Sequence, residues 1–154
     1  MDTAINDAST LCTEAAALIG KSSKEGGIPD IRQVPALVLA YLGDAVYELI
    51  IRTRLVEDGM SHVNDLNKKA SAYAKAPTQA KLFHLLEEDL TEEEISAYKR
   101  GRNAKSGSVA KSGTVTDYRT ATGFEAMLGM LYLAGKTDRI MELVSSGIAR
   151  LEEK

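Results

Sequence analysis

Cysteine and aromatic residues are scarce in this sequence. Cys12 is the only cysteine among the 154 residues, tryptophan is absent, and phenylalanine occurs twice. A single cysteine excludes an internal disulfide and favours a reducing compartment such as the cytoplasm. A core built mainly from aliphatic side chains favours packed helices over a β-sandwich, which draws more on aromatic and β-branched residues. We therefore expect an all-α fold.

Long hydrophobic segments are also missing. No stretch of about 20 residues is apolar enough to span a membrane. The N-terminus carries Asp2 and Asp7 in place of the basic segment of a secretory signal. The length of 154 residues is enough for one domain with a substantial core and too short for two. These features predict a cytoplasmic protein with no membrane partner.

Positive charge is in slight deficit, but it is unevenly distributed. The formal net charge of −3 argues against a surface that binds polyanions as a whole. Between Lys99 and Arg119, however, six basic residues accompany one acidic residue, Asp117. Acidic residues are concentrated elsewhere, for example at 92–94 and 152–153. The basic stretch is therefore a local feature that can serve one binding site.

The chain divides into an N-terminal appendage and one domain. Residues 1–33 include a polar, glycine-rich connector, whereas residues 34–154 hold apolar residues at helical spacing. The spacing predicts helices over 34–57, 63–75, 77–86, 91–100, 119–134 and 137–151. The stretch 101–117 is rich in glycine and serine and has no apolar periodicity, so we expect a long loop there. Loops of this length in compact domains are usually functional or disordered.

Two of the predicted helices each carry one carboxylate within an apolar run. These are Asp44, which follows Gly43, and Glu125, which precedes Gly129. An ionised carboxylate in apolar surroundings is unfavourable unless it is paired or bound to a cation, and the glycines would let the two helices approach closely. A pair of carboxylates suits a hard cation such as Mg²⁺, which can activate water and stabilise charge on a phosphodiester. The alternative is structural, because such an aspartate is often solvated, capped or salt-bridged, and Asp44 could pair with Arg52 of a neighbouring chain.

Both acids lie in segments that resemble motifs of one enzyme family. Tyr41–Leu49 resembles the signature helix of the ribonuclease III family, and Phe124–Leu133 resembles the second acidic motif of that family. The basic stretch Arg100–Gly107 and the end of the chain at Lys154 are similar to the stand-alone bacterial branch, Mini-ribonuclease III. We accordingly expect no double-stranded RNA-binding domain. The resemblance covers about residues 34–150.

The resemblance implies an all-α homodimer with the ribonuclease III endonuclease-domain fold and its two signature helices at the interface. It implies Mg²⁺-dependent hydrolysis of both strands of an RNA duplex, with Mn²⁺ as a substitute and with 5′-phosphate products. Asp44 takes the place of the signature aspartate and Glu125 that of the essential glutamate, so both are expected to be catalytic and to hold the metal. In bacteria the stand-alone form is associated with maturation of the 23S ribosomal RNA precursor, aided by a large-subunit ribosomal protein.

Two positions depart from the pattern of the full-length family. Where that family carries another acid one turn before Asp44, this chain has Ala40; where it carries an aspartate three residues before Glu125, this chain has Thr122. The stand-alone branch shows the same two departures, which leave open how many metal ions are bound. One alternative is therefore an inactive relative that binds RNA or the ribosome. A third hypothesis is a helical dimer with no role in RNA.

The basic stretch supplies the candidate RNA-binding residues. A-form duplexes are recognised mainly through phosphates and 2′-hydroxyls, which suit flexible cationic and polar side chains. Together with the acidic motifs, this predicts RNA contacts from Arg100, Arg102, Asn103, Lys105, Lys111 and Arg119. Without such motifs, a charged loop is usually only solvated. Lys68 and Lys69 are further candidates, for which an exposed helix face is an equally good explanation.

Overall fold

The computed structural model describes residues 30–105 and 113–153. Every regular element within these two ranges is helical, which confirms the all-α prediction. The elements are η2 (Ile31–Gln33), α2 (Ala36–Glu57), α3 (Val63–Ala74), α4 (Ala76–Leu86), η3 (Glu87–Asp89), α5 (Glu92–Asn103), α6 (Val115–Leu133) and α7 (Thr137–Glu152). The predicted appendage lies outside the described residues except for 30–33, so its separation from the domain stays a prediction.

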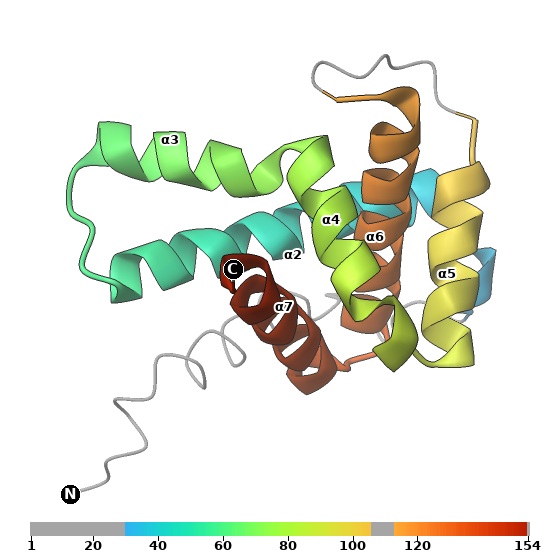
Figure 1. The fold of residues 1–154 in the computed structure, drawn as a ribbon. Coiled ribbons are helices and arrows are strands. Elements are labelled where there is room, and N and C mark those ends of the chain that lie inside the picture. Colours follow the sequence, from blue (N-terminus) through green and yellow to red (C-terminus); the bar gives the residue numbers. More distant parts are fainter. Residues whose placement is uncertain (1–29, 106–112, 154) are drawn as a thin grey trace, which may run out of the picture.

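Helix α6 forms the centre of the fold (Figure 1). It packs against α2, α4, α5 and α7. All its residues from Thr120 to Leu131 are buried except Glu125, which is partly exposed. The apolar run that predicted this helix is therefore explained by burial within a single chain.

Helix α2 buries only one side of its apolar surface. Leu39, Tyr47 and Ile50 face the core, whereas the opposite side exposes several large apolar side chains. The exposed ones are Leu37, Val38, Tyr41, Leu49 and Val56. No helix in the described ranges, α2 included, is long and apolar enough to cross a membrane.

Two glycines allow α2 and α6 to cross with their backbones in contact. A Cβ atom added at Gly43 on α2 would collide with the backbone carbonyl of Glu125 on α6. A Cβ atom added at Gly129 on α6 would collide with the carbonyl oxygen of Leu39 on α2. The close approach predicted from these two glycines is thus present, and it determines where the two helices touch.

A buried tyrosine connects this crossing to its surroundings. The ring of Tyr47 on α2 lies edge-to-face on Phe124 of α6, with the ring centroids 5.7 Å apart. Its hydroxyl donates a hydrogen bond of 2.8 Å to the carbonyl oxygen of Tyr73 on α3. Because Phe124 directly precedes Glu125, these contacts hold the backbone beside one of the two acids.

The helices around the predicted long loop extend further than the sequence indicated. Helix α5 begins with a capping box of Thr91 and Glu94, as the spacing suggests, and continues to Asn103. Helix α6 begins at Val115, because Thr114 and Asp117 form a second capping box that satisfies its first turn. The predicted loop at 101–117 was therefore too long at both ends.

Candidate active site

The two acids meet where α2 crosses α6. Gly43 lies against the backbone of Glu125, and Asp44 is the next residue on α2. The side chain of Asp44 lies close enough to Glu125 to raise the pKa of that carboxyl group. The structure therefore brings together, from two separate helices, the residues that the sequence indicated.

The environment of Glu125 disfavours its ionised form. Its pKa is raised from an ordinary 4.5 to about 9. Burial is the largest cause, and Asp44 and the charge of Glu48 raise the pKa further, whereas Gln79 lowers it. A carboxyl group with this pKa is neutral at pH 7 unless a positive charge is placed beside it. Such shifts in a cluster of facing acids are typical of sites that bind cations or exchange protons.

The acid that α2 contributes to this pair, Asp44, is more exposed than Glu125. Asp44 is exposed, and so are Tyr41 and Ala45 near it on α2. It is thus less buried than its apolar sequence neighbours suggested. Within the chain, Arg52 pairs with Glu48, whose Oε2 lies 3.6 Å from Arg52 Nη2. This surface pair contributes little stability, and it leaves Asp44 facing Glu125.

Gln79 on α4 is a third polar residue at this site, and the sequence analysis missed it. Its side chain is buried, with 2% of the residue exposed, and it acts on Glu125 in the direction that lowers the pKa. Its Nε2 makes no hydrogen bond, and no other buried side-chain nitrogen or oxygen among the described residues is left unpaired. A signal was present, because Gln79 lies one turn before Phe83 on the inward face of α4.

The donor set at this crossing fits a hard divalent cation. Asp44 and Glu125 offer carboxylate oxygens, and the buried amide of Gln79 lies beside Glu125. The described part of the chain contains no group of three or more Asp, Glu, His or Cys residues that could hold a metal ion. A cation such as Mg²⁺ nevertheless needs only one or two carboxylates, because it keeps much of its water shell.

The two departures from the full-length family pattern add no ligand. Ala40 is buried on the core side of α2 and has no polar side chain. Thr122 is also buried, and its hydroxyl donates a hydrogen bond of 3.0 Å to the carbonyl oxygen of Tyr118 within α6. Neither position therefore adds a carboxylate to the pair of Asp44 and Glu125.

The predicted RNA-binding residues at the end of α5 are partly occupied by contacts within the chain. Arg100 donates a hydrogen bond of 2.8 Å from Nη2 to the carbonyl oxygen of Val34. Arg102 donates a hydrogen bond of 3.1 Å from Nε to Asn103 Oδ1, and its guanidinium lies 5.5 Å from the centre of the Tyr98 ring. Arg100 thus also ties the segment between η2 and α2 to α5, a structural role that the sequence did not reveal.

Lys105 and Arg119 lie at a shared hollow. They line a cavity of about 420 Å³ between the end of α5 and the start of α6, together with Tyr118 and Thr122. Thr122 is three residues before Glu125, so this hollow lies about one turn of α6 away from that acid. Lys111, the remaining candidate of the basic stretch, lies outside the described residues.

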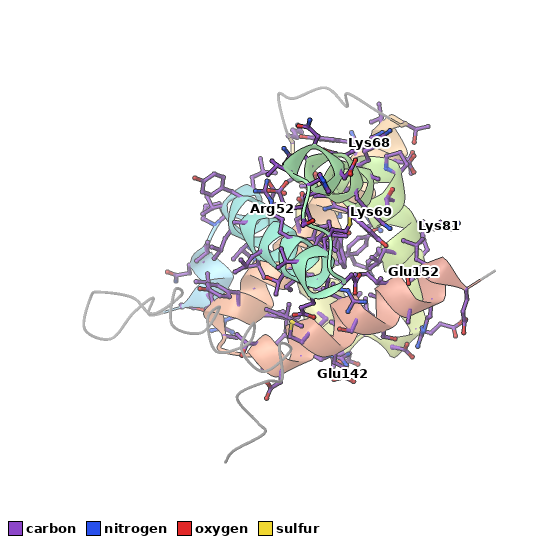
Figure 2. The ribbon with its side chains drawn as sticks, turned by 90° about the vertical axis from the view of Figure 1, so that its left-hand side faces the viewer. Arg52, Lys68, Lys69, Lys81, Glu142 and Glu152 are labelled. Atoms are coloured by element: carbon purple, nitrogen blue, oxygen red, sulfur yellow. The ribbon has the colours of Figure 1, made fainter. Side chains whose placement is uncertain are left out.

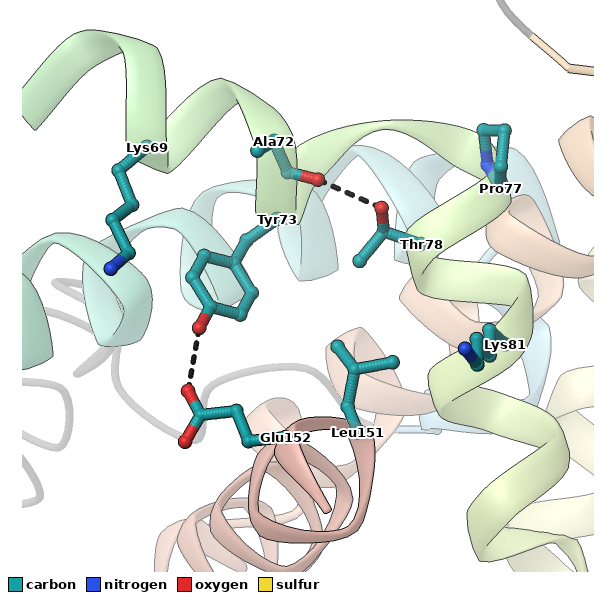
Figure 3. A pocket seen from close by; sticks show the side chains of 8 residues that line it. All are labelled: Lys69, Ala72, Tyr73, Pro77, Thr78, Lys81, Leu151 and Glu152. Atoms are coloured by element: carbon teal, nitrogen blue, oxygen red, sulfur yellow. Dashed lines mark hydrogen bonds between the residues drawn. The ribbon is translucent and has the colours of Figure 1, made fainter. Parts of the chain in front are cut away.

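Lys68 and Lys69 project from α3 (Figure 2), and both are exposed. Lys69 lines a different cavity of about 510 Å³, which also involves Lys81 of α4 and Leu151 of α7 (Figure 3). There, the hydroxyl of Tyr73 donates a hydrogen bond of 2.7 Å to Glu152 Oε1. Lys69 therefore lies at a different cavity from the one that Lys105 and Arg119 line.

Comparison with known proteins gives a consistent result. Residues 37–136 match the ribonuclease III domain family. The chain is 45% identical to the Mini-ribonuclease 3 of Symbiobacterium thermophilum over 119 residues, which make up 77% of this chain and 92% of that protein. It is 49% identical to the Mini-ribonuclease 3 of Brevibacillus brevis over 116 residues, 75% of this chain and 87% of that protein. A crystal structure of a Fusobacterium nucleatum protein superposes with a TM-score of 0.69 at 34% identity, covering 74% of this chain and 93% of that one.

Proposed function

This chain belongs to the ribonuclease III family, within its Mini-ribonuclease 3 branch, and we propose that it cleaves double-stranded RNA at the carboxylates of Asp44 and Glu125. Membership makes it a double-strand-specific endoribonuclease of a family that generally depends on divalent metal ions. The observation that supports the site is the meeting of Asp44 and Glu125 from two helices that touch backbone to backbone. The ion is Mg²⁺, with Mn²⁺ as a substitute, because the donors are hard oxygen atoms.

The proposed chemistry assigns one task to both acids. Asp44 and Glu125 would hold the cation, and the close crossing of α2 and α6 fixes the backbone from which the two side chains extend. When bound, the cation supplies positive charge that activates water and stabilises charge on the phosphodiester. A water molecule adds to phosphorus while the bond to the 3′-oxygen breaks, so the products carry a 5′-phosphate and a 3′-hydroxyl.

The exposed apolar side of α2 is the proposed homodimer interface. Val38, Tyr41 and Leu49 recur at helical spacing on this side, and Tyr41 is 83% exposed in the single chain. Exposed apolar surfaces of this kind mark interaction sites. In a dimer with two-fold symmetry, this side of α2 would pack against the same side of α2 in the second copy. Because each chain carries one acid pair, a dimer carries two, one for each strand of a duplex.

The RNA lies across the basic end of the domain in this proposal. Lys105 and Arg119 contact phosphates from the hollow beside the start of α6, and Lys111, which is outside the described residues, stays a predicted contact. Arg102 and Asn103 contribute polar contacts at the end of α5. Arg100 has less freedom, because it already bonds to Val34. Lys68 and Lys69 extend the surface only if a long duplex reaches α3.

The proposed natural substrate is the 23S ribosomal RNA precursor in the cytoplasm, with a large-subunit ribosomal protein as a helper. This assignment rests on the association of the stand-alone branch with ribosomal RNA maturation. It predicts that the enzyme cuts paired ends of the precursor, where both strands of the duplex are available. Depletion of the protein in its own host should then lengthen the ends of 23S ribosomal RNA.

Incubation of the pure protein with labelled RNA duplex, single-stranded RNA and duplex DNA, with and without Mg²⁺, tests the proposed function. Cleavage of the RNA duplex alone, and only with Mg²⁺, is the expected result. Asp44→Asn should abolish cleavage, whereas Glu57→Gln, which alters an exposed acid at the far end of α2, should not. Duplex binding without cleavage by wild-type protein would instead support an inactive RNA-binding relative.

A further inference from the structure

Gln79 is a buried amide whose donor is not used by the fold. Only 2% of the residue is exposed, and its Nε2 is the one buried side-chain nitrogen or oxygen in the described ranges that makes no hydrogen bond. Buried polar groups are nearly always paired, because an unpaired one loses its bonds to water without compensation. An unpaired amide in this place therefore calls for a function beyond packing.

The side chain of Gln79 lies close enough to Glu125 to influence the pKa of that carboxyl group. It lies in α4, which packs against α6, and its neighbours on the same face of α4 are core residues such as Phe83. Its side chain acts on Glu125 in the sense expected of an amide that donates to a carboxylate, since it favours the ionised form. In the single chain the side chain of Gln79 lies near Glu125, but its Nε2 completes no hydrogen bond.

We propose that Gln79 is a positioning residue, which donates from Nε2 to the Glu125 carboxylate and holds it in the orientation that receives a cation beside Asp44. This inference rests on the proposed function of the acid pair. Asp44 and Glu125 come from α2 and α6, and Gln79 adds a third support from α4. Partners of this kind, which do not touch the metal, fix the orientation of the residues that do.

A structural role and a positioning role predict opposite effects on stability. If Gln79 mainly supported the fold, its removal would lower the melting temperature. If its donor is kept for Glu125, replacement by an apolar side chain of similar length removes an unpaired amide and leaves the metal-free fold equally or more stable. Gln79→Met has the required shape, and Gln33→Met in η2 is a matched control on an exposed glutamine.

Three measurements on full-length protein decide between these roles. They are the melting temperature in EDTA, the Kd for Mn²⁺ by calorimetry without RNA, and kcat and KM on a short RNA duplex. For Gln79→Met we expect an unchanged or higher melting temperature, a Kd for Mn²⁺ weaker by roughly 10-fold or more, a lower kcat and an unchanged KM. Gln33→Met should match wild type throughout.

Two outcomes overturn the inference. One is a lower melting temperature for Gln79→Met with wild-type Mn²⁺ affinity and kcat, which assigns Gln79 to the fold alone. The other is wild-type behaviour in all three measurements. Gln79→Leu, which lacks the donor but differs in shape, separates a packing fault from loss of the amide. If Asp44→Asn abolishes Mn²⁺ binding and cleavage while both Gln79 variants retain them, the inference about Gln79 fails and the proposed function stands. If the wild-type protein neither binds Mn²⁺ nor cleaves RNA, the proposed function fails as well.

Discussion

The backbone carbonyl of Glu125 on α6 lies where a Cβ atom of residue 43 on α2 would otherwise be. Gly43 therefore lets the two helices touch directly, and the same crossing carries its neighbour Asp44 to the side chain of Glu125. The separation of the two acids is set by helix packing and not by a loop. Sites built on packed helices hold their functional groups more accurately than sites built on loops.

Gly43→Ala should weaken the fold and the cleavage activity together. The added methyl group meets backbone atoms that cannot rotate away, so α2 and α6 must separate. Overpacking of this kind typically costs about 1–3 kcal/mol. A urea titration gives the free energy of unfolding, and a duplex RNA assay gives the rate.

Gly59→Ala is the control for that substitution. Gly59 has a φ of 89° and no atom near its Cβ position, so alanine there strains only the local backbone. It should cost about 1–2 kcal/mol, because a residue with a Cβ atom is strained in the left-handed region, and it should leave cleavage intact. A wild-type cleavage rate in Gly43→Ala would show that the close crossing does not position the acids.

The metal-free protein should lose stability as the pH rises from about 5 to about 9. In the unfolded chain Glu125 releases its proton near its ordinary pKa of 4.5, whereas burial and Asp44 hold it protonated in the folded chain up to about 9. Between these values the folded state binds more protons, so raising the pH favours unfolding. Urea titrations across this range in EDTA measure the slope, which Glu125→Gln should flatten. Equal slopes for the variant and wild type would contradict the raised pKa.

Tyr41→Asp should convert the proposed dimer into a folded monomer. The substitution places a charge in the middle of the exposed apolar side of α2, where Tyr41 is 83% exposed in the single chain. Charged groups without partners are strongly disfavoured at the centre of an interface. Light scattering gives the mass, and circular dichroism checks the helix content. Val63→Asp alters an exposed valine on α3 and should remain dimeric; a dimeric Tyr41→Asp would place the interface elsewhere.

Arg119→Ala should weaken duplex RNA binding and reduce its dependence on salt. Each phosphate contact that is lost lowers the slope of the logarithm of affinity against the logarithm of salt concentration by about one. Fluorescence anisotropy at several salt concentrations, in Ca²⁺ or EDTA to prevent cleavage, measures the slope. Lys81→Ala, at the cavity beside α7, is the matched control and should bind as wild type does. Identical slopes for Arg119→Ala and wild type would remove Arg119 from the RNA surface.

Local sequence patterns predicted the helices and the meeting of the two acids. Thr91 and Glu94 lie at the spacing of a capping box, and the structure contains that box. Asp44 and Glu125 each interrupt an apolar run next to glycines, a pattern that reports both a helix contact and an unusual carboxylate. Such features depend on neighbours within one or two turns, so they can be read from the chain directly.

Features that depend on a third element could not be predicted in the same way. Gln79 matters because α4 packs beside Glu125, and nothing in its own helix identifies that partner. Arg100 bonds to Val34, a residue far away in the sequence. The exposure of Asp44 follows from which side of α2 meets α6, since both sides of this helix are apolar. In each case tertiary packing decides what periodicity leaves open.

Titration with Mn²⁺, followed by electron paramagnetic resonance, tests most directly whether Asp44 and Glu125 share a cation. The account predicts that wild-type protein binds Mn²⁺ and that Asp44→Asn and Glu125→Gln each weaken binding by more than roughly 100-fold, since loss of a ligand should exceed the loss of an outer partner. Circular dichroism should show that both variants remain helical. Wild-type Mn²⁺ affinity in either folded variant would contradict the account.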